Sequence, residues 1–352
     1  MRLTFIIIEV VKKPSPKLLI MDTRPNQLSF VAMLKKAIPA NVNMADEVAE
    51  LLEVSADSAY RRLRGETDFS LEELVMLAST YNISLDTSLM NGNKMVSFRT
   101  NELSTHVSGF ADYLGVLHSD LKWIRQWPNA KITYAAEDLP VFYHFFFPQL
   151  ARFKMVYWNK SILGNTELNS AFVEDVHIPE EWRAEVPRII DVFSQMPSVE
   201  IWHEDTLKST LKQIEYYAQV GYFKQKETLA QLMQELTDLM LMVRIQAEYG
   251  RKYQPYTKKV LDTPFELYAS EVMIGNNCVL LNSDVQNATY LSYNTFNFIQ
   301  TKNEVFNQQT IDWTKNLLSK SNRISEVAEI ARAQYFKQRM EEIDELRGRL
   351  RL

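Results

Sequence analysis

Residues 45–65 combine side chains that could read the base edges and phosphates of a nucleic acid. Small polar groups come first and arginines follow close behind, and the outward-facing residues are Ala56, Asp57, Ser58, Tyr60, Arg61 and Arg64. A helix that enters the DNA major groove places its N-terminal residues on base edges, while flanking basic groups hold phosphates. The order of these side chains therefore favours recognition of double-stranded DNA.

Four short helices are predicted to position this segment within residues 27–92. The first has apolar residues at 28, 31, 34 and 38 and is closed by Pro39, and the second covers residues 44–52. Ser55 is the expected N-cap of the third, which ends at Gly65, and Ser70 with Glu73 predicts a capping box for a fourth over residues 71–81. The side chains expected to face the core are Val48, Leu52, Val54, Ala59 and Leu63.

This arrangement resembles the helix-turn-helix of the Cro/C1 (XRE) repressor family over roughly residues 27–86. The residues that carry the resemblance are Val54-Ser55, Tyr60-Arg61-Arg62-Leu63-Arg64-Gly65, Phe69-Ser70-Leu71-Glu72-Glu73-Leu74 and Asn82-Ile83-Ser84-Leu85-Asp86. Glu53 stands where that family usually has a turn glycine, and Met44-Ala45-Asp46 stands where it commonly has a glutamine. The first difference is costly only if the turn requires a positive φ.

The resemblance implies a lambda-repressor-like bundle that binds operator DNA. Bases would be read by Ser55, Asp57, Ser58, Tyr60 and Arg61, and phosphates would be held by Arg62, Arg64 and Thr67. Residues 1–95 contain 11 Lys and Arg against 12 Asp and Glu, so a single copy should bind DNA weakly and a dimer should bind better. Two alternatives stay open, a helix-turn-helix that docks a protein and an incidental helical hairpin.

A heptad-like seam follows directly in residues 95–128. Its apolar residues alternate by 4 and 3, and they are Leu103, Val107, Phe110, Leu114, Leu117, Leu121 and Ile124. Such spacing is typical of a helix that packs along a 3.5-residue seam, which predicts a connector and dimerisation helix. A long helix buried within one subunit is the alternative.

The rest of the chain, residues 129–352, is predicted to be mostly helical. A short strand is expected at 131–137, helices at 179–194, 205–222 and 225–249, and a β-hairpin formed by 266–274 and 278–282. The fold class is therefore mainly α, with a small β-hairpin element in the C-terminal domain. The aromatic run at 142–147, with Tyr157 and Trp158, would pack in a core or line an effector pocket.

Several classes of function are disfavoured by what the sequence lacks. It contains no GxGxxG or GxxxxGK[ST] motif, one cysteine and five scattered histidines, so we expect no nucleotide cofactor, no metal site and no catalytic residues. No apolar stretch is long enough to span a membrane, and residues 1–26 are expected to be an arm or linker. The lone Cys278 fits a reducing cytoplasm.

Together these features predict a homodimeric transcription regulator with a C-terminal domain that senses a small-molecule or peptide effector. A protein-interaction scaffold that does not bind an operator is the alternative, and an unrecognised enzyme within residues 130–352 is a third reading.

Overall fold

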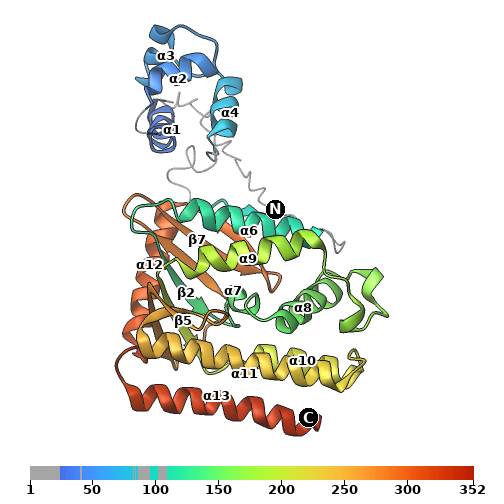
Figure 1. Cartoon of the computed structure of the whole chain (residues 1–352). Helices are drawn as coiled ribbons and strands as arrows, with labels where there is room; N and C mark the ends of the chain where they lie inside the picture. The colour runs from blue at the N-terminus through green and yellow to red at the C-terminus, as the bar shows by residue number, and fades with distance from the viewer. Residues whose placement is uncertain (1–23, 40–41, 82, 84, 86–95, 102–108) are drawn as a thin grey trace, which may run out of the picture. The chain divides into compact units, whose positions relative to one another are not determined.

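The computed structural model describes residues 24–39, 42–81, 83, 85, 96–101 and 109–352. The chain forms two compact units, Met1–Ser97 and Phe98–Leu352 (Figure 1). The expected arm, residues 1–26, lies mostly outside the described residues, as does the expected boundary near residue 92.

The N-terminal unit contains the four expected helices, and these are α1 (Arg24–Ala37), α2 (Met44–Leu51), α3 (Ala56–Leu63) and α4 (Leu71–Thr80). Both predicted caps are confirmed. The Ser55 hydroxyl accepts from the Ser58 amide at 3.2 Å, and Ser70 and Glu73 form a reciprocal capping box. The residues expected to face the core do pack in it, with Val48 and Ala59 fully buried.

The C-terminal unit is built around a mixed sheet that has nine strands among the described residues. The strands are β1 (Arg99–Thr100), β2 (Lys131–Ala136), β3 (Ser198–His203), β4 (Arg251–Gln254), β5 (Lys259–Ser270), β6 (Cys278–Asn282), β7 (Asn287–Tyr293), β8 (Asn297–Thr301) and β9 (Ser321–Arg323). The prediction of a mainly α fold with only a small hairpin is therefore wrong for this unit. The short strand expected at 131–137 is confirmed as β2.

The strand order is β1-β8-β7-β6-β2-β3-β5-β4, with β9 also pairing with β5. Strands β2, β3 and β5 are parallel, and the other pairs are antiparallel. The predicted hairpin is wrong, because β6 pairs with β2 and β7 rather than with β5. The Asn277 carboxamide, which lies between the two segments of the predicted hairpin, accepts from the backbone amides of Glu137 and Asp138 at 2.8 and 3.2 Å.

Helices cover both faces of the sheet, and they are α6 (Gly109–Ile124), α7 (Val141–His144), α8 (Pro148–Tyr157), α9 (Glu180–Ser194), α10 (Lys208–Val220), α11 (Lys226–Tyr249), α12 (Glu304–Ser319) and α13 (Glu329–Leu350). The three helices expected at 179–194, 205–222 and 225–249 are confirmed as α9, α10 and α11. Figure 1 shows α12 on one side of the sheet and the larger helical layer on the other. Side chains alternate accordingly, since Ile132 and Tyr134 of β2 join the large core while Ala135 packs with Leu317 of α12.

The aromatic run at 142–147 lies in the large core, where its rings pack against one another and against α9. Phe142 stacks on Phe193, and Trp158 stacks on Phe296. These contacts support the core reading of the run over the effector-pocket reading.

Candidate nucleic-acid interface

Helix α3 is held by a tight turn from α2. The Val54 amide donates to the Ala49 carbonyl at 3.0 Å, and Ala49 is small enough to let the two helices pack closely. Ser55 then caps α3, while Ala59 anchors its inner side in the core. The other side of α3 is consequently turned to solvent.

Glu53 in this turn has a φ of +54°, within the left-handed region. A residue with a Cβ pays about 1–2 kcal/mol for this conformation, which glycine adopts freely. The turn therefore requires the backbone shape that a glycine would supply, and Glu53 adopts it at a cost.

The exposed face of α3 and the loop after it carries most of the predicted DNA-contacting residues, which are Ser55, Asp57, Tyr60, Arg61, Arg64 and Thr67. Arg61 pairs with Asp57 at 3.1 Å, one turn away on the same helix. The Arg64 guanidinium lies 4.6 Å from the centre of the Tyr60 ring, and its pKa is raised by the hydrogen bond to the Tyr60 hydroxyl. Exposed pairs of this kind are weak, so a DNA phosphate could replace Asp57 as the partner of Arg61, or Tyr60 as the partner of Arg64, at little cost.

Arg62 is placed differently from the phosphate contact that the resemblance implied. Its side chain is only 17% exposed, and it pairs with Glu73 at 3.0 Å. It also donates to the Ser58 hydroxyl and carbonyl at 2.5 and 3.3 Å, so both Arg62 and Ser58 are engaged within the unit. Burial raises the pKa of the Glu73 carboxyl, but Arg62 and the Ser70 amide together bring it below its usual value. Arg62 therefore joins α3 to the capping box of α4.

Gln27 of α1 fixes the loop that follows α3, a role that the sequence analysis missed. Its side-chain amide donates to the carbonyls of Arg62 and Thr67, both at 2.8 Å, and its oxygen accepts from the Phe69 amide at 3.2 Å. No local pattern signals this role, because the three partners lie far along the chain. Gln27 thereby sets the position of Thr67 beside the exposed arginines.

The predicted dimerisation seam is only partly described. Leu103, Val107 and the side chain of Phe110 lie outside the described residues. Leu114, Leu121 and Ile124 are buried in the core of their own unit, where α6 packs against α9, and Leu117 lies half-buried against that core. In this conformation these side chains are not available to a second chain, which favours the alternative of a helix buried within one subunit, while the dimer seam stays a prediction.

In the part of the chain that the structure describes, no group of three or more His, Cys, Asp or Glu side chains could hold a metal ion. Within the same residues, no helix combines the length and apolar character that crossing a membrane requires.

A family model described as the BetR domain matches residues 31–109, which is less than half of the chain. This span begins within α1 and includes α2, α3 and α4, and the description names neither the Cro/C1 family nor an activity. Searches of curated proteins and of solved structures gave no match.

Proposed function

We propose that this protein is a sequence-specific DNA-binding transcription regulator that uses α3 as its recognition helix. The observation that carries the proposal is the solvent-facing side of α3, where Asp57, Tyr60, Arg61 and Arg64 are exposed while the opposite side is fixed in the core. Polar and basic groups at the start and end of an exposed helix suit base edges and phosphates, respectively.

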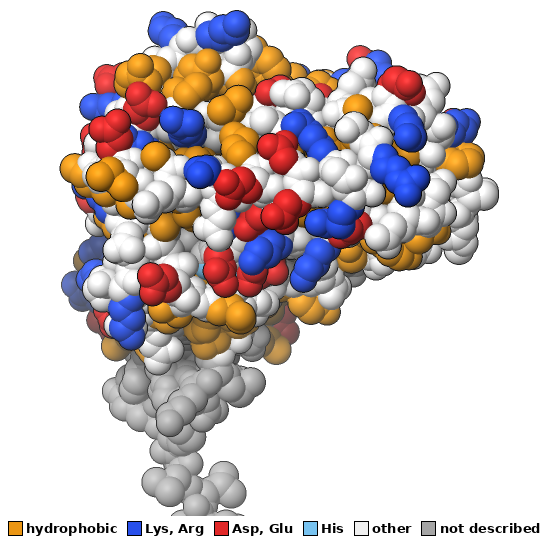
Figure 2. Space-filling view, turned by 90° about the horizontal axis from the view of Figure 1, so that it is seen from below, with side chains coloured by type: hydrophobic (Ala, Val, Ile, Leu, Met, Phe, Trp, Pro, Cys, Tyr) orange, Lys and Arg blue, Asp and Glu red, His pale blue; other side chains and the backbone are white. Residues whose placement is uncertain are grey.

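The charge distribution supports binding as two copies. Residues 1–95 are nearly neutral, so one N-terminal unit neutralises few phosphates and two units on one site would double the contacts. Figure 2 shows acidic and basic side chains interspersed on the face of the C-terminal unit that it presents, rather than a broad basic area. The N-terminal unit is therefore the proposed DNA contact, and the larger unit is the proposed site of pairing and sensing.

The test is a selection of random DNA duplexes by the full-length protein at near-physiological salt, followed by sequencing. We expect an enriched palindrome whose half-sites are about ten base pairs apart, the spacing of two recognition helices related by a two-fold axis. A folded protein that enriches no sequence, even at low salt, would contradict the proposal and favour the protein-docking scaffold.

Three arginine variants then separate recognition from folding. Arg61→Ala should cost about 1–3 kcal/mol of binding and relax the sequence preference, whereas Arg64→Ala should weaken all sequences alike. Arg62→Ala should mainly lower the stability of the N-terminal unit, because it removes the ion pair with Glu73. Lys337→Ala, at a site 77% exposed on α13, is the matched control for the loss of one positive charge.

A further inference from the structure

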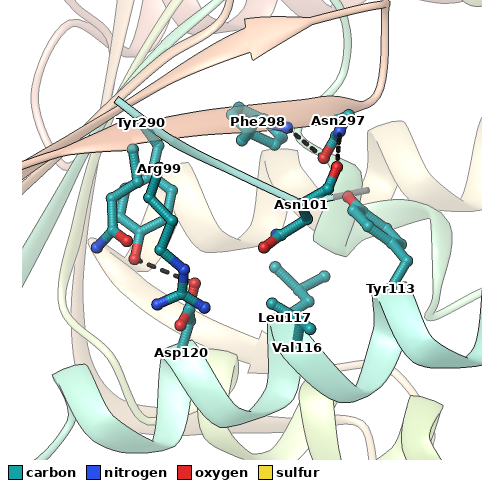
Figure 3. A pocket seen from close by; sticks show the side chains of 10 residues that line it. Arg99, Asn101, Tyr113, Val116, Leu117, Asp120, Tyr290, Asn297 and Phe298 are labelled. Carbon is teal, nitrogen blue, oxygen red and sulfur yellow. Dashed lines mark hydrogen bonds between the residues drawn. The ribbon is translucent and has the colours of Figure 1, made fainter. Parts of the chain in front are cut away.

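A row of polar side chains crosses three strands at one end of the sheet in the C-terminal unit. Arg99 of β1 lies opposite Gln300 of β8, and Gln300 lies opposite Tyr290 of β7. Asp120 projects from α6 over this row and accepts a hydrogen bond from the Tyr290 hydroxyl at 3.3 Å (Figure 3). The strand register thus brings Arg99, Gln300, Tyr290 and Asp120 around one place, although they come from four elements.

These side chains line a cavity of about 40 Å³ between α6 and the sheet. A buried water needs about 10–15 Å³ of such space, so the cavity has room for a small polar head group but not for a large ligand. A wider, open groove shares Arg99, Val116 and Asp120 with the cavity and extends to Glu181 and Glu185 of α9. A ligand could therefore place its head in the cavity and its tail in the groove.

Gln300 leaves hydrogen-bonding capacity at this place. Its side chain lines the cavity and is 7% exposed, and among the described residues its carboxamide makes no hydrogen bond. Buried carboxamides are nearly always bonded to protein, water or a ligand. The Gln300 carboxamide thus lines the cavity without a hydrogen-bond partner among the described residues, and a water or a ligand there could supply one.

The charges around the cavity and groove favour a cation. Of the described residues that line them, Asp112, Asp120, Glu181 and Glu185 carry negative charge and Arg99 alone carries positive charge. Glu185 is already paired with His118 and Arg188, at 2.8 and 2.6 Å. The other three carboxylates still outnumber the one positive charge of Arg99, so the lining carries an excess of negative charge.

Asp120 is the carboxylate nearest to the enclosed end of this site. Burial raises the pKa of its carboxyl, while Arg99, the Tyr290 hydroxyl and Lys302 act in the opposite direction. Lys302 lies over the Trp123 ring, 4.1 Å from its centre, and although it is close enough to act on the pKa of Asp120, the two form no direct ion pair among the described residues. A charged donor that bonds directly to Asp120 would offset the unfavourable burial of this carboxylate.

We propose that this cavity and groove bind a small aliphatic amine. Its primary ammonium group donates to the Asp120 carboxylate and to the side-chain oxygen of Gln300, and its aliphatic part lies against Val116. A second ammonium group, where present, reaches Asp112 and Glu181 in the groove, so diamines bind more tightly than monoamines of the same length.

The test is titration calorimetry of the full-length protein without DNA, using 1,4-diaminobutane, n-butylamine and succinate at constant ionic strength. We expect diaminobutane to bind more tightly than butylamine and succinate not to bind. Asp120→Asn, which keeps the shape of the side chain and can still accept from Tyr290, should weaken diamine binding at least tenfold. Gln300→Leu should weaken it as well, by severalfold.

Glu248→Gln is the matched control, because Glu248 is an exposed carboxylate on α11 outside the cavity and groove and should leave binding unchanged. Absence of amine binding, equal binding by Asp120→Asn and the unaltered protein, or preferential binding of succinate would each overturn the proposal. Since no DNA is present, these outcomes are independent of whether the N-terminal unit binds an operator.

Discussion

In the N-terminal unit, the hydrogen bonds that begin α3 and α4 join residues only three positions apart, as in Ser55 to Ser58 and Ser70 to Glu73. In the C-terminal unit, β2 pairs in parallel with β3 and β3 with β5, across the helices that separate these strands in the chain. The first unit is therefore specified mainly by short-range contacts, and the second depends on long-range contacts.

The two units also differ in where their charged side chains lie. The arginines that α3 presents are solvated and weakly paired, which leaves them free to change partners. In the C-terminal unit, Lys252 and Glu200 are almost fully buried and lie 3.4 Å apart. The Tyr143 hydroxyl also donates to Glu200, at 2.8 Å. Buried charges are tolerated only with such partners, so charge is confined to internal pairs in the second unit, whereas in the first it faces solvent.

The largest expected effect comes from breaking the buried pair. Lys252→Met should lower the free energy of unfolding of the C-terminal unit by about 3–5 kcal/mol, because Glu200 loses its buried cation. The N-terminal unit should be unaffected, and denaturation followed separately for the two units would measure this. Replacing both partners, as Lys252→Met with Glu200→Leu, should cost less than the single substitution.

The same pair predicts a dependence of stability on pH. Burial lowers the pKa of the Lys252 ammonium to about 8, although Glu200 raises it. In the unfolded chain the lysine has its ordinary pKa near 10.4. Between pH about 8 and about 10, the Lys252 amine is therefore protonated in the unfolded chain but largely deprotonated in the folded one. Stability should consequently rise between pH 8 and about 10, and Lys252→Met should remove this rise. Equal slopes for both proteins would refute the assignment.

A somewhat smaller effect is expected at the predicted dimer seam. Leu114→Ala should lower the free energy of unfolding of the C-terminal unit by about 3 kcal/mol, because it opens a cavity in the core where Leu114 is fully buried. Sedimentation should show no change in molecular mass. A change in mass without a loss of stability would instead indicate that Leu114 packs in an interface between two chains.

The smallest effect is expected at the turn before α3. Glu53→Gly should raise the free energy of unfolding of the N-terminal unit by about 0.5–1 kcal/mol, because relief of the left-handed strain exceeds the entropy cost of glycine. Thermal unfolding of the unit is the measurement, and Glu50→Gly, within α2, should destabilise it instead. A loss of stability on Glu53→Gly would mean that the turn carries no strain.

Strand β3 shows why much of the second unit could not be predicted. Its sequence, Ser198–His203, contains glutamate and histidine at positions that are nevertheless buried, so it shows no alternation of polar and apolar residues. Glu200 can be buried there because Tyr143, Trp202 and Lys252 all bond to it. Strand β7 is similar, since Thr289 is buried through its hydrogen bond to Asn307 of α12.

The sequence by itself determined the helices of the N-terminal unit, the N-caps of α3 and α4 and most of the exposed set on α3, because these depend on periodicity and on hydrogen bonds between near neighbours. Only the tertiary structure decided that Arg62 pairs with Glu73, that Gln27 holds the loop after α3, and that Leu114 and Leu121 belong to an internal core. It also decided the strand pairing that brings Arg99, Gln300 and Asp120 together. Each of these depends on a partner distant in the chain, and local residue patterns do not specify such partners.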